Sequence, residues 1–386
     1  VATVPRLRKS QRSSASKPLQ IRLRDGAGFS NFMKTKQKHA FPYEWTLKDA
    51  NFTKDKGSVF SCFSCGGGST MGYKLAGFDV IGCNEIDPKM MDAYIANHNP
   101  RFPYLESIQT FKDRDDLPPE LYDLDILDGS PPCSSFSMAG NREKDWGKEK
   151  KFREGQADQV LDRLFFDFID LAKKLQPKVV IAENVKGLLL GDAQKYVNEI
   201  LLAFDDAGYH VSYKLLDASK MGVPQMRERV FFYAVRKDLH NGEFEDLFQS
   251  EPRLELEFEG LPIPFSEIDT MTGGRDMPDS VFEYWSLMGN ESGPLSKVHD
   301  KGSFFGEIKA DPDRPLCTIT SQGKIYHHTH PRRLNSIEFI KGGTYPADYD
   351  FKQNKPFYLI GMSVPPVMTA QVATRVYEQW LEGIKS

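Results

Sequence analysis

Apolar runs of strand length alternate with amphipathic segments from Ser58 to Val235. Six of these runs have the length and composition of strands: Val59–Phe63, Val80–Asn84, Leu124–Leu127, Val179–Ala182, Tyr209–Leu215 and Val230–Val235. Near-continuous apolar strands separated by helices are typical of a parallel sheet that helices cover on both faces. The pattern therefore predicts an α/β fold with a Rossmann-like sheet, whose ligands bind at the carboxyl ends of the strands.

Three segments carry apolar residues at the spacings of three and four that are typical of helices. The first two lie between predicted strands, and the third lies near the end of the chain. They are Leu161, Leu164, Phe165, Phe168, Leu171 and Leu175; Val197, Ile200, Leu201 and Phe204; and Val372, Val376, Trp380, Leu381 and Ile384. The last stripe predicts a terminal helix that returns to pack on the large domain.

The alternating pattern weakens after about Leu239. Residues 240–350 are rich in Gly, Pro, Asp and His and hold only short strand-like pieces such as Leu316–Thr320. This change in composition predicts a second, smaller domain with long loops. We therefore expect four regions: an N-terminal extension (1–50), a large domain (51–240), a small domain (241–350) and a C-terminal segment that returns to the large domain (351–386).

The net charge of -4 hides an asymmetry along the chain. Residues 1–40 hold ten Lys/Arg and one acid, Asp25, which gives +9 and leaves -13 for the remaining residues. Few apolar residues and several serines favour a solvated, flexible tail. The same charge also suits an arm that contacts phosphates. Both interpretations of this basic extension stay open at the level of sequence.

A chain of 386 residues with 40% apolar content can form one large domain and a smaller one. No apolar run reaches the length of a membrane span, and no charged-then-apolar leader is visible.

Five thinly spread cysteines suit a reducing compartment, so we expect a cytoplasmic protein. Cys62 and Cys65 are spaced C-x-x-C but lack the partner pair of a metal site, so we expect them to pack in the core.

A glycine-rich turn, Cys65-Gly66-Gly67-Gly68, follows the first predicted strand and opens a helix. Glycines let the backbone approach a ligand closely, and a helix start offers free N–H groups. Glu85 ends the second strand 17 residues after Gly68, where a carboxylate can accept both hydroxyls of a ribose. The pair suggests a nucleoside-containing cofactor. The dinucleotide pattern G-x-G-x-x-G fails, because Met71 stands where the third Gly is required.

One thiol, Cys133, follows the apolar run Leu124–Leu127 on a loop stiffened by Pro131 and Pro132. A proline ring fixes its own backbone angle and offers no donor for sheet pairing, so the loop can hold the thiol in place. Taken alone, a cysteine is more often a small core residue than a nucleophile. Its position past a strand end makes it a candidate nucleophile here.

Two further segments place polar groups at strand ends. Glu183 follows the strand Val179–Ala182, and Arg227 and Arg229 precede the strand Val230–Val235. Alternate residues of an extended segment point the same way, so the two arginines share a face. The polar segment Gly140–Gln156, with six Lys/Arg and four acids, is either a solvated loop or a mobile lid.

His327, His328 and His330 form a cluster in the predicted small domain. No acid or cysteine cluster accompanies them in the neighbouring sequence, so a solvated loop is the expected structure and no metal is assigned.

These segments together resemble the DNA (cytosine-5)-methyltransferases of the bacterial modification type. The resemblance runs from about Val59 to Val235 and from about Arg314 to the end. Its motifs stand in the family's order: Pro132-Cys133, Gln159–Asp167, Glu183-Asn184-Val185, Gln225-x-Arg227-x-Arg229, Arg333-Leu334 with Glu338, and Gly361–Pro366. The resemblance implies a catalytic and cofactor-binding domain at 51–240 and a small target-recognition domain at 241–350. The implied fold is the S-adenosylmethionine-dependent methyltransferase sheet.

The resemblance also implies a mechanism. Cys133 adds to carbon 6 of a cytosine, and carbon 5 then accepts a methyl group from S-adenosylmethionine. Glu183 stabilises charge at ring nitrogen 3, and Arg229 or Arg227 binds the carbonyl oxygen of the base. A thiol cannot attack a stacked base, so the nucleotide has to be swung out of the duplex. The segment Gly140–Gln156 is then expected to close over the DNA.

Cofactor contacts follow from the same resemblance: Phe63, Gly67, Gly68, Glu85, Ile86, Ile108, Pro132, Leu164 and Ser363. Glu85 is expected on the ribose and Ile86 beside the adenine. Four positions depart from the family's usual residues: Cys65 replaces a Gly, Ser107 stands at the place of an Asp, Ser134 at that of a Gln and Met362 at that of an Asn.

Double-stranded DNA is the implied partner, with residues 240–312 as the region that reads it and Arg275 as one candidate for a base contact. A monomer without an obligate protein partner or membrane contact is expected. A restriction endonuclease can accompany it in the same system without direct contact.

Four other functions were weighed. An inactive DNA-binding relative would lack Cys133 or Glu183, and both are present. A transfer-RNA methyltransferase of related fold is weakly disfavoured by the long segment 240–350. A zinc deaminase needs H-x-E and P-C-x-x-C, and Phe136 fills the position of the second Cys. A nicotinamide dehydrogenase is disfavoured by Met71 and the Pro-Pro-Cys loop.

Overall fold

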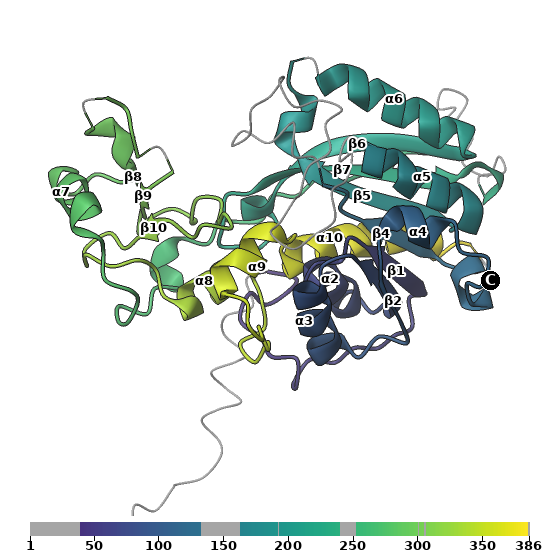
Figure 1. Cartoon of the computed structure of the whole chain (residues 1–386), viewed down its shortest axis with the longest axis horizontal. Coiled ribbons are helices and arrows are strands. Elements are labelled where there is room, and N and C mark those ends of the chain that lie inside the picture. The colour runs from purple at the N-terminus through teal and green to yellow at the C-terminus, as the bar shows by residue number, and fades with distance from the viewer. Residues whose placement is uncertain are drawn as a thin grey trace, which may run out of the picture. The chain divides into compact units, whose positions relative to one another are not determined.

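The computed structural model describes residues 39–132, 163–191, 193–239, 252–299, 301–304 and 306–384. These residues form a seven-stranded sheet in the order β3-β2-β1-β4-β5-β7-β6 (Figure 1). The strands are β1 (Ser58–Cys62), β2 (Asp79–Glu85), β3 (Phe102–Leu105), β4 (Ile126–Gly129), β5 (Val179–Val185), β6 (Tyr209–Asp217) and β7 (Glu228–Arg236). The predicted α/β fold is confirmed, and all six predicted strands are present. The sequence analysis missed β3, a four-residue edge strand that contains Pro103 and alternates half-buried with exposed residues.

The predicted parallel sheet is present in five strands, and one side of it differs from the prediction. Strands β3, β2, β1, β4 and β5 are parallel neighbours, but β7 lies antiparallel to both β5 and β6. Strand β6 ends at Asp217 and β7 begins at Glu228, with only a short 3-10 turn, η4 (Ala218–Lys220), between them. So short a connection cannot contain the crossover that parallel strands need, so the two strands pair as antiparallel neighbours.

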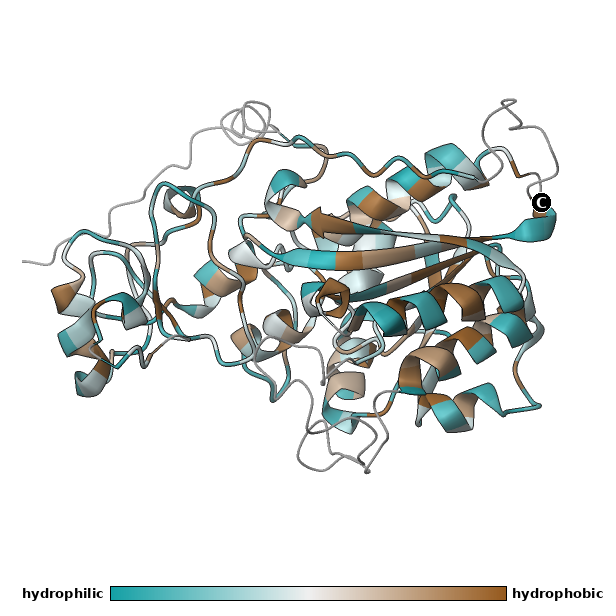
Figure 2. Ribbon diagram, turned by 90° about the horizontal axis from the view of Figure 1, so that it is seen from above, coloured by the Kyte–Doolittle hydropathy of each residue, from teal (hydrophilic) through white to brown (hydrophobic). Residues whose placement is uncertain are grey.

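Helices cover both faces of the sheet, as the apolar strands predict. One hydrophobic cluster joins alternate strand residues, such as Phe60, Leu127 and Val180, to α4 (Ile108–Lys112), α5 (Leu164–Leu175) and α6 (Ala193–Asp206). The intervening residues, such as Val59 and Ile126, face a second cluster with α2 (Gly68–Leu75) and α10 (Pro366–Val376). Along the flanking helices hydrophobic residues alternate with hydrophilic ones (Figure 2). The period of two in the strands thus divides the core into two layers.

The C-terminal stripe forms α10 and a following π-helical turn, η8 (Tyr377–Leu381). Val372, Val376 and Leu381 are buried in the second cluster, and Trp380 and Ile384 pack against it. Helix α10 lies along α2, so the end of the chain covers the sheet beside the glycine-rich turn.

The region after residue 252 contains small elements. They are η6 (Phe265–Glu267), α7 (Asp279–Leu287), β8 (Gly293–Pro294), η7 (Leu295–Lys297), β9 (Ile308–Lys309), β10 (Ile325–Tyr326), α8 (Ser336–Gly342) and α9 (Pro356–Met362). Strands β10, β9 and β8 make a three-stranded sheet. The remaining elements are α3 (Pro88–His98), η1 (Pro119–Tyr122), η3 (Lys186–Leu189) and η5 (Lys237–Leu239).

The strand-like piece Leu316–Thr320 is not a strand. Only Leu316 makes a single parallel bridge, to Gln225. The Gln225 side chain accepts a hydrogen bond from the Ile319 N–H at 2.9 Å, and the Arg227 guanidinium donates to the Ile319 carbonyl at 3.1 Å. Side chains thus satisfy backbone groups that a strand would satisfy by pairing.

The folded unit begins at His39. Trp45 donates its indole N–H to the Thr344 carbonyl at 2.9 Å, and Tyr43 and Trp45 pack against the cluster that contains Phe339. The predicted domain boundaries themselves stay predictions. Among the described residues, no helix combines the length and apolar character needed to cross a membrane.

Candidate active site at the carboxyl edge of the sheet

One row of paired residues crosses five neighbouring strands: Asn84, Cys62, Gly129, Ala182 and Phe232. The residues that follow this row in β2, β1 and β5 belong to the predicted site: Glu85, Phe63 and Glu183. In β4 the next residue is Ser130, which leads to Pro131 and Pro132. The predicted ribose ligand, the glycine-rich turn, the Pro-Pro loop and the candidate acid therefore follow neighbouring strands at the carboxyl end of the sheet. From β1 the chain adds β2 and β3 on one side of the sheet and then β4 and β5 on the other side. Ligands of such sheets bind at the carboxyl ends of the strands where the order changes direction.

Glu183 and Arg229 form an ion pair at this edge. The Nε atom of Arg229 lies 2.8 Å from Oε1 of Glu183, and the two side chains are 14% and 12% exposed, respectively. Strand register explains the contact, because Arg229 pairs with Val185, and Glu183 lies two residues from Val185 on the same face. Burial lowers the pKa of Arg229, and the Glu183 carboxylate opposes this shift. The pair orients a carboxylate while leaving part of it open to solvent.

Arg227 has a different environment from Arg229. Its side chain is buried, and its guanidinium donates to the carbonyls of Ile319 at 3.1 Å, Gly361 at 3.1 Å and Ser363 at 2.8 Å. These bonds connect the start of β7 to the segment that contains Ser363, one of the predicted cofactor contacts. Of the two arginines that the sequence left open, the geometry favours Arg229 as the partner of Glu183. Arg227 instead fixes the backbone at Ile319, Gly361 and Ser363.

Asn184 connects β5 to the loop that carries the candidate nucleophile. Its Nδ2 donates to the Pro131 carbonyl at 3.1 Å, and its Oδ1 accepts from the Val185 N–H. Cys133 itself, and the segment Gly140–Gln156, lie outside the described residues. No function was predicted for Asn184 from the sequence. Its position was a usable signal, because Asn184 follows Glu183 in an extended strand and so points to the opposite face.

Glu85 fastens the end of β2 to the glycine-rich turn. Its Oε2 accepts from the Cys65 N–H at 2.8 Å, and its Oε1 accepts from the N–H groups of Ile86 and Asp87 at 2.9 and 2.8 Å. Phe63 and Cys65 adopt left-handed backbone angles, with φ of 52° and 49°. A residue without a Cβ occupies this region at no steric cost, which explains why Gly is usual at the position of Cys65.

The turn is packed so closely that larger residues do not fit. A Cβ on Gly67 would lie 2.2 Å from Nε2 of His98, and one on Gly68 would lie 2.5 Å from the Val364 carbonyl. Helix α3 and the segment before α10 therefore hold the turn from two sides. Ser363 next to that contact donates its hydroxyl to the Leu359 carbonyl at 2.8 Å.

The predicted cofactor residues differ in exposure. Phe63, Ile86 and Pro132 are half-buried, whereas Ile108 and Leu164 are only 2% and 1% exposed in the first core cluster. All five stay predicted cofactor contacts, and the first three have more surface open to a ligand than the last two. At the position where an Asp was expected, Ser107 caps α4 by accepting the Thr110 N–H. Met362 packs against the third core cluster.

Cys62, Cys65 and Cys83 are buried, and thiol–thioether contacts join Cys65 to Met90 and Cys83 to Met91 at 3.6 and 3.8 Å. They pack in the core, as expected from their spacing.

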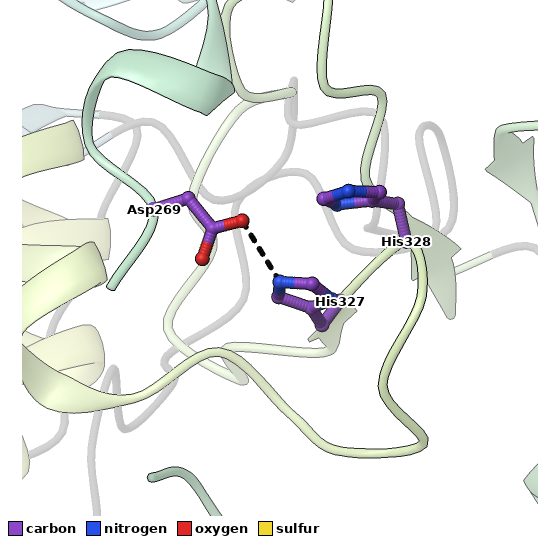
Figure 3. A group of neighbouring side chains, drawn as sticks. All are labelled: Asp269, His327 and His328. Atoms are coloured by element: carbon purple, nitrogen blue, oxygen red, sulfur yellow. Dashed lines mark hydrogen bonds and ion pairs between the residues drawn. The ribbon is translucent and has the colours of Figure 1, made fainter. Parts of the chain in front are cut away.

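The prediction that the histidines lie in a solvated loop is correct for the exposed His330 but wrong for His327. His327 is fully buried, and its Nε2 lies 2.9 Å from Oδ2 of Asp269, with His328 stacked on it at 4.3 Å between ring centroids (Figure 3). Phe265 packs on both rings. The acid comes from 58 residues earlier in the chain, so inspection of neighbouring sequence could not find it.

Asp269, His327 and His328 bring three potential metal-ligand atoms within 4.8 Å of one another. The hydrogen bonds favour a different arrangement. Nδ1 of His327 accepts the N–H groups of Thr329 and His330 at 3.0 and 3.1 Å, so the ring proton resides on Nε2 and is donated to Asp269. A metal on Nε2 would have to displace that proton, whereas metal-bound histidines normally donate from the other nitrogen. Burial lowers the pKa of His327, which keeps the ring neutral.

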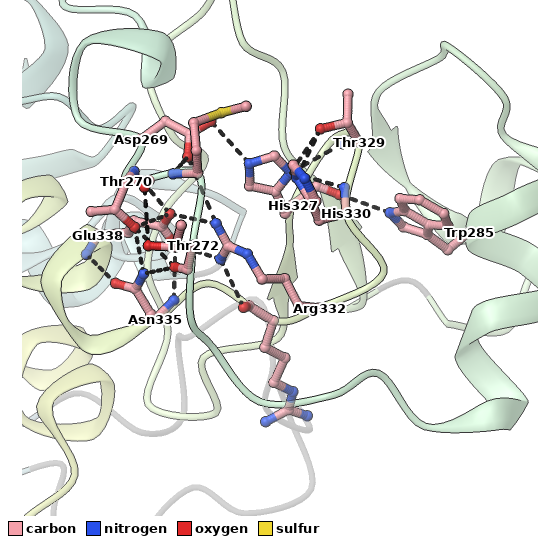
Figure 4. A network of polar contacts seen from close by, with 12 residues as sticks. Asp269, Thr270, Thr272, Trp285, His327, Thr329, His330, Arg332, Asn335 and Glu338 are labelled. Atoms are coloured by element: carbon pink, nitrogen blue, oxygen red, sulfur yellow. Dashed lines mark hydrogen bonds and ion pairs between the residues drawn. The ribbon is translucent and has the colours of Figure 1, made fainter. Parts of the chain in front are cut away.

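A buried ion pair adjoins this cluster (Figure 4). The two terminal guanidinium nitrogens of Arg332 each donate to a carboxylate oxygen of the fully buried Glu338, at 2.8 and 2.7 Å. Glu338 also accepts from Thr270 and from the Asn335 N–H, and Asn335 and Glu338 form a capping box at the start of α8. Arg275, the candidate for a base contact, is exposed, and its carbonyl accepts the Arg333 N–H.

Replacing Glu338 by Ala should destabilise the protein by about 3 kcal/mol, because Arg332 would lose its bidentate partner and remain buried with only the Asp269 carboxylate at 3.7 Å. Urea unfolding of the variant measures the change. A matched control is Glu378→Ala, which removes a pair with Arg375 whose side chains are 50% and 45% exposed; it should cost under about 0.5 kcal/mol. Equal midpoints for the two variants would contradict this account of Glu338.

With the geometry in place, sequence comparison decides the family. The profile described as C-5 cytosine-specific DNA methylase matches residues 57–378. The chain belongs to this family. The family prediction from the motifs is thereby confirmed.

Relatives of this family member include several proteins named as type II methyltransferases. The type II methyltransferase M.FnuDI of Fusobacterium nucleatum is 37% identical over 188 residues, which is 48% of this chain and 49% of that protein. The chain thus spans about half the length of M.FnuDI. M1.HphI of Haemophilus parahaemolyticus is 29% identical over 81% of this chain and 85% of its own length. M.MthTI of Methanothermobacter thermautotrophicus is 28% identical over 84% of this chain and 98% of its own length.

Solved structures show the same fold. A DNA modification methyltransferase encoded within a prophage of E. coli aligns with a TM-score of 0.59 at 20% identity, covering 83% of this chain and 99% of that one. A mutant of Spodoptera frugiperda DNMT2 aligns with a TM-score of 0.57 at 16% identity and the same coverage.

Proposed function

We propose that this family member transfers a methyl group from S-adenosylmethionine to carbon 5 of a cytosine swung out of duplex DNA. The observation that carries the proposal is the Glu183–Arg229 pair beside the Asn184–Pro131 hydrogen bond. They support the proposal because Asn184, the residue after Glu183 in β5, bonds to Pro131, which precedes Cys133 by two residues. The glycine-rich turn and Glu85 lie at the same sheet edge, where a methyl donor would reach the same base.

The chemistry divides into two stages. In the first, the Cys133 thiolate forms a bond to carbon 6, and the displaced electron pair makes carbon 5 nucleophilic. Glu183 stabilises the ring by a proton or hydrogen bond at nitrogen 3, and Arg229 holds Glu183 and faces the carbonyl oxygen of the base. In the second, carbon 5 takes the methyl group, a base removes the carbon 5 proton, and the carbon–sulfur bond breaks to restore the thiolate.

The donor set at the sheet edge fits S-adenosylmethionine, which supplies an electrophilic methyl group on a sulfonium. Glu85 is a fixed carboxylate that suits the ribose hydroxyls, and half-buried Phe63 and Ile86 suit the adenine. Gly67 and Gly68 keep the turn free of side chains, and Pro132 and Ser363 complete the proposed wall. Ile108 and Leu164 support it from the core.

Sequencing of modified bases tests the proposal. DNA incubated with the protein and S-adenosylmethionine should acquire 5-methylcytosine at one position of one recognition sequence. Transfer RNA incubated in parallel should remain unmodified. Methylation of the RNA alone, or of no nucleic acid, would reject the proposed substrate.

The names of the relatives support a biological setting. Several are type II methyltransferases, and others are orphan methyltransferases of Bacillus phages. We propose that this protein works as a monomer in the bacterial cytoplasm, either in a restriction-modification system or as a solitary methylase. Residues 240–312, including the exposed Arg275, are the proposed DNA-reading region, and a paired endonuclease would act without direct contact.

The basic extension provides a further test. Removing residues 1–38 should leave the folded unit intact and flatten the dependence of DNA affinity on salt, because ten Lys/Arg near phosphates release counterions on binding. The cut cannot extend to residue 45, since Trp45 bonds to Thr344 in the folded unit. A full-length control with Arg6, Arg8, Lys9 and Arg12 changed to Ser should show part of the effect. An unchanged salt slope in both would indicate an idle tail.

A further inference from the structure

Asp128 is a buried carboxylate inside the core of the sheet, and the proposed chemistry does not use it. It lies in β4, is 4% exposed, and accepts hydrogen bonds from the hydroxyls of Ser61 at 2.8 Å, Ser69 at 2.8 Å and Tyr73 at 3.1 Å. None of the ion pairs among the described residues includes it. A buried charge without a cation is costly, and a core strand would normally place an apolar residue here.

The three hydroxyls come from two neighbouring elements. Ser61 lies opposite Asp128 in the parallel pair of β1 and β4. Ser69 and Tyr73 lie four residues apart in α2, so they share one face of that helix. Ser69 follows Gly68 directly, and Asp128 lies three residues before Pro131. The carboxylate therefore links the proposed donor turn to the strand that continues into the Pro-Pro segment.

We propose that Asp128 is a positioning residue that holds the Gly66–Gly68 turn in register with strand β4, so that the donor and the base meet. This inference rests on the proposed function and adds a residue to it. The glycines of the turn supply no side chains that could anchor it to β4. Ser69 and Tyr73 supply the nearest anchors, and Asp128 is the common acceptor for both.

The ionisation of Asp128 makes the arrangement sensitive to pH. Burial raises the pKa of Asp128 to about 6, and the nearby Glu183 charge adds to this shift, against the effect of the three hydroxyls. The other titratable groups that face it are Cys62, Tyr73 and Tyr94, whose pKa values burial raises, so they stay neutral in this range. Below about pH 6 the carboxyl gains a proton and loses acceptor capacity for one of its donors.

The pH dependence of folding stability and that of donor affinity should have opposite signs at Asp128, so the two effects can be told apart. Because the folded pKa lies above the ordinary value of 3.8, Asp128 favours the folded state most at low pH, and this contribution is lost as the pH rises through about 6. The turn, in contrast, should be held better as the pH rises, because the ionised carboxylate accepts hydrogen bonds from all three hydroxyls. Affinity for the donor should therefore fall with decreasing pH while the contribution of Asp128 to stability rises.

Calorimetric titration with S-adenosylmethionine between pH 5 and 8 tests this, with thermal unfolding of each variant alongside. Asp128→Ala should weaken binding at pH 8 by about tenfold or more, since bonds to a charged acceptor are lost. Asp128→Asn keeps the shape and remains neutral, so its affinity should not change with pH. Tyr73→Phe removes one of the three donors and preserves packing, so it should show an intermediate loss of affinity for S-adenosylmethionine. This variant keeps the inference testable if Asp128→Ala fails to fold.

Asp125→Asn is the matched control, because Asp125 lies in the approach to the same strand and bonds to Ser58 and Lys178, away from the turn. It should keep both the affinity and the pH dependence of the wild type. Folded Asp128 variants with wild-type affinity and pH dependence would overturn the inference. A wild-type chain that binds no S-adenosylmethionine at any pH would instead overturn the proposed function, and this inference with it.

Discussion

Cys133→Ser is expected to abolish methyl transfer while S-adenosylmethionine still binds. The proposed reaction needs a sulfur nucleophile that adds to carbon 6 and later leaves. A free thiol has a pKa near ~8.5, so its surroundings can supply thiolate at neutral pH, whereas a serine hydroxyl does not ionise there. Incorporation of labelled methyl groups into DNA measures turnover, and calorimetry measures retained binding.

The matched control is Cys317→Ser, the same change at the half-buried cysteine of the region after residue 252. It should retain turnover. A DNA substrate with fluorine at carbon 5, which has no proton to lose there, should remain covalently attached to the wild type and to Cys317→Ser. The same substrate should leave Cys133→Ser free. Turnover by Cys133→Ser at the wild-type rate would end the covalent mechanism.

Glu183→Gln is expected to slow the chemical step by about 100-fold or more, the range for loss of a general acid. The amide can still accept the hydrogen bond that Arg229 donates at 2.8 Å, so the strand geometry should survive. What the variant loses is the negative charge and the exchangeable proton at ring nitrogen 3. Single-turnover kinetics with saturating DNA and S-adenosylmethionine isolate this step from binding.

A neighbouring glutamate provides the control for this substitution. Glu228 pairs with Lys186 at the surface, where the two side chains are 45% and 41% exposed, respectively. Glu228→Gln should leave the chemical step within about twofold of wild type, since exposed pairs contribute little. Similar rates for both variants would remove Glu183 from the mechanism.

Several features were predictable from local sequence. Apolar runs located six strands, because a strand buried on both faces needs apolar residues at nearly every position. Helical spacing located α5, α6 and α10, because one face of each helix packs on the sheet. Parallel strands end at a common edge, so Glu85, Glu183 and the Pro-Pro loop were expected together before any contact was known.

Other features depended on contacts between distant parts of the chain. The edge strand β3 carried too little apolar signal to detect. Arg227 and Arg229 look equivalent in an extended segment, yet one binds three carbonyls and the other binds Glu183. Asp128 lies just past the predicted strand Leu124–Leu127, and no local pattern marked it. Its three hydroxyl partners come from residues that are 55 to 67 positions away.

The sequence by itself determined the strand and helix pattern, the family motifs and the identity of the candidate nucleophile and acid, since these depend on residue type and local periodicity. Tertiary structure alone decided the antiparallel edge, the division of labour between the two arginines and the burial of His327 against Asp269. The physical reason is that side chains find partners through the register of the sheet and the packing of loops. Those contacts join residues that no local pattern connects.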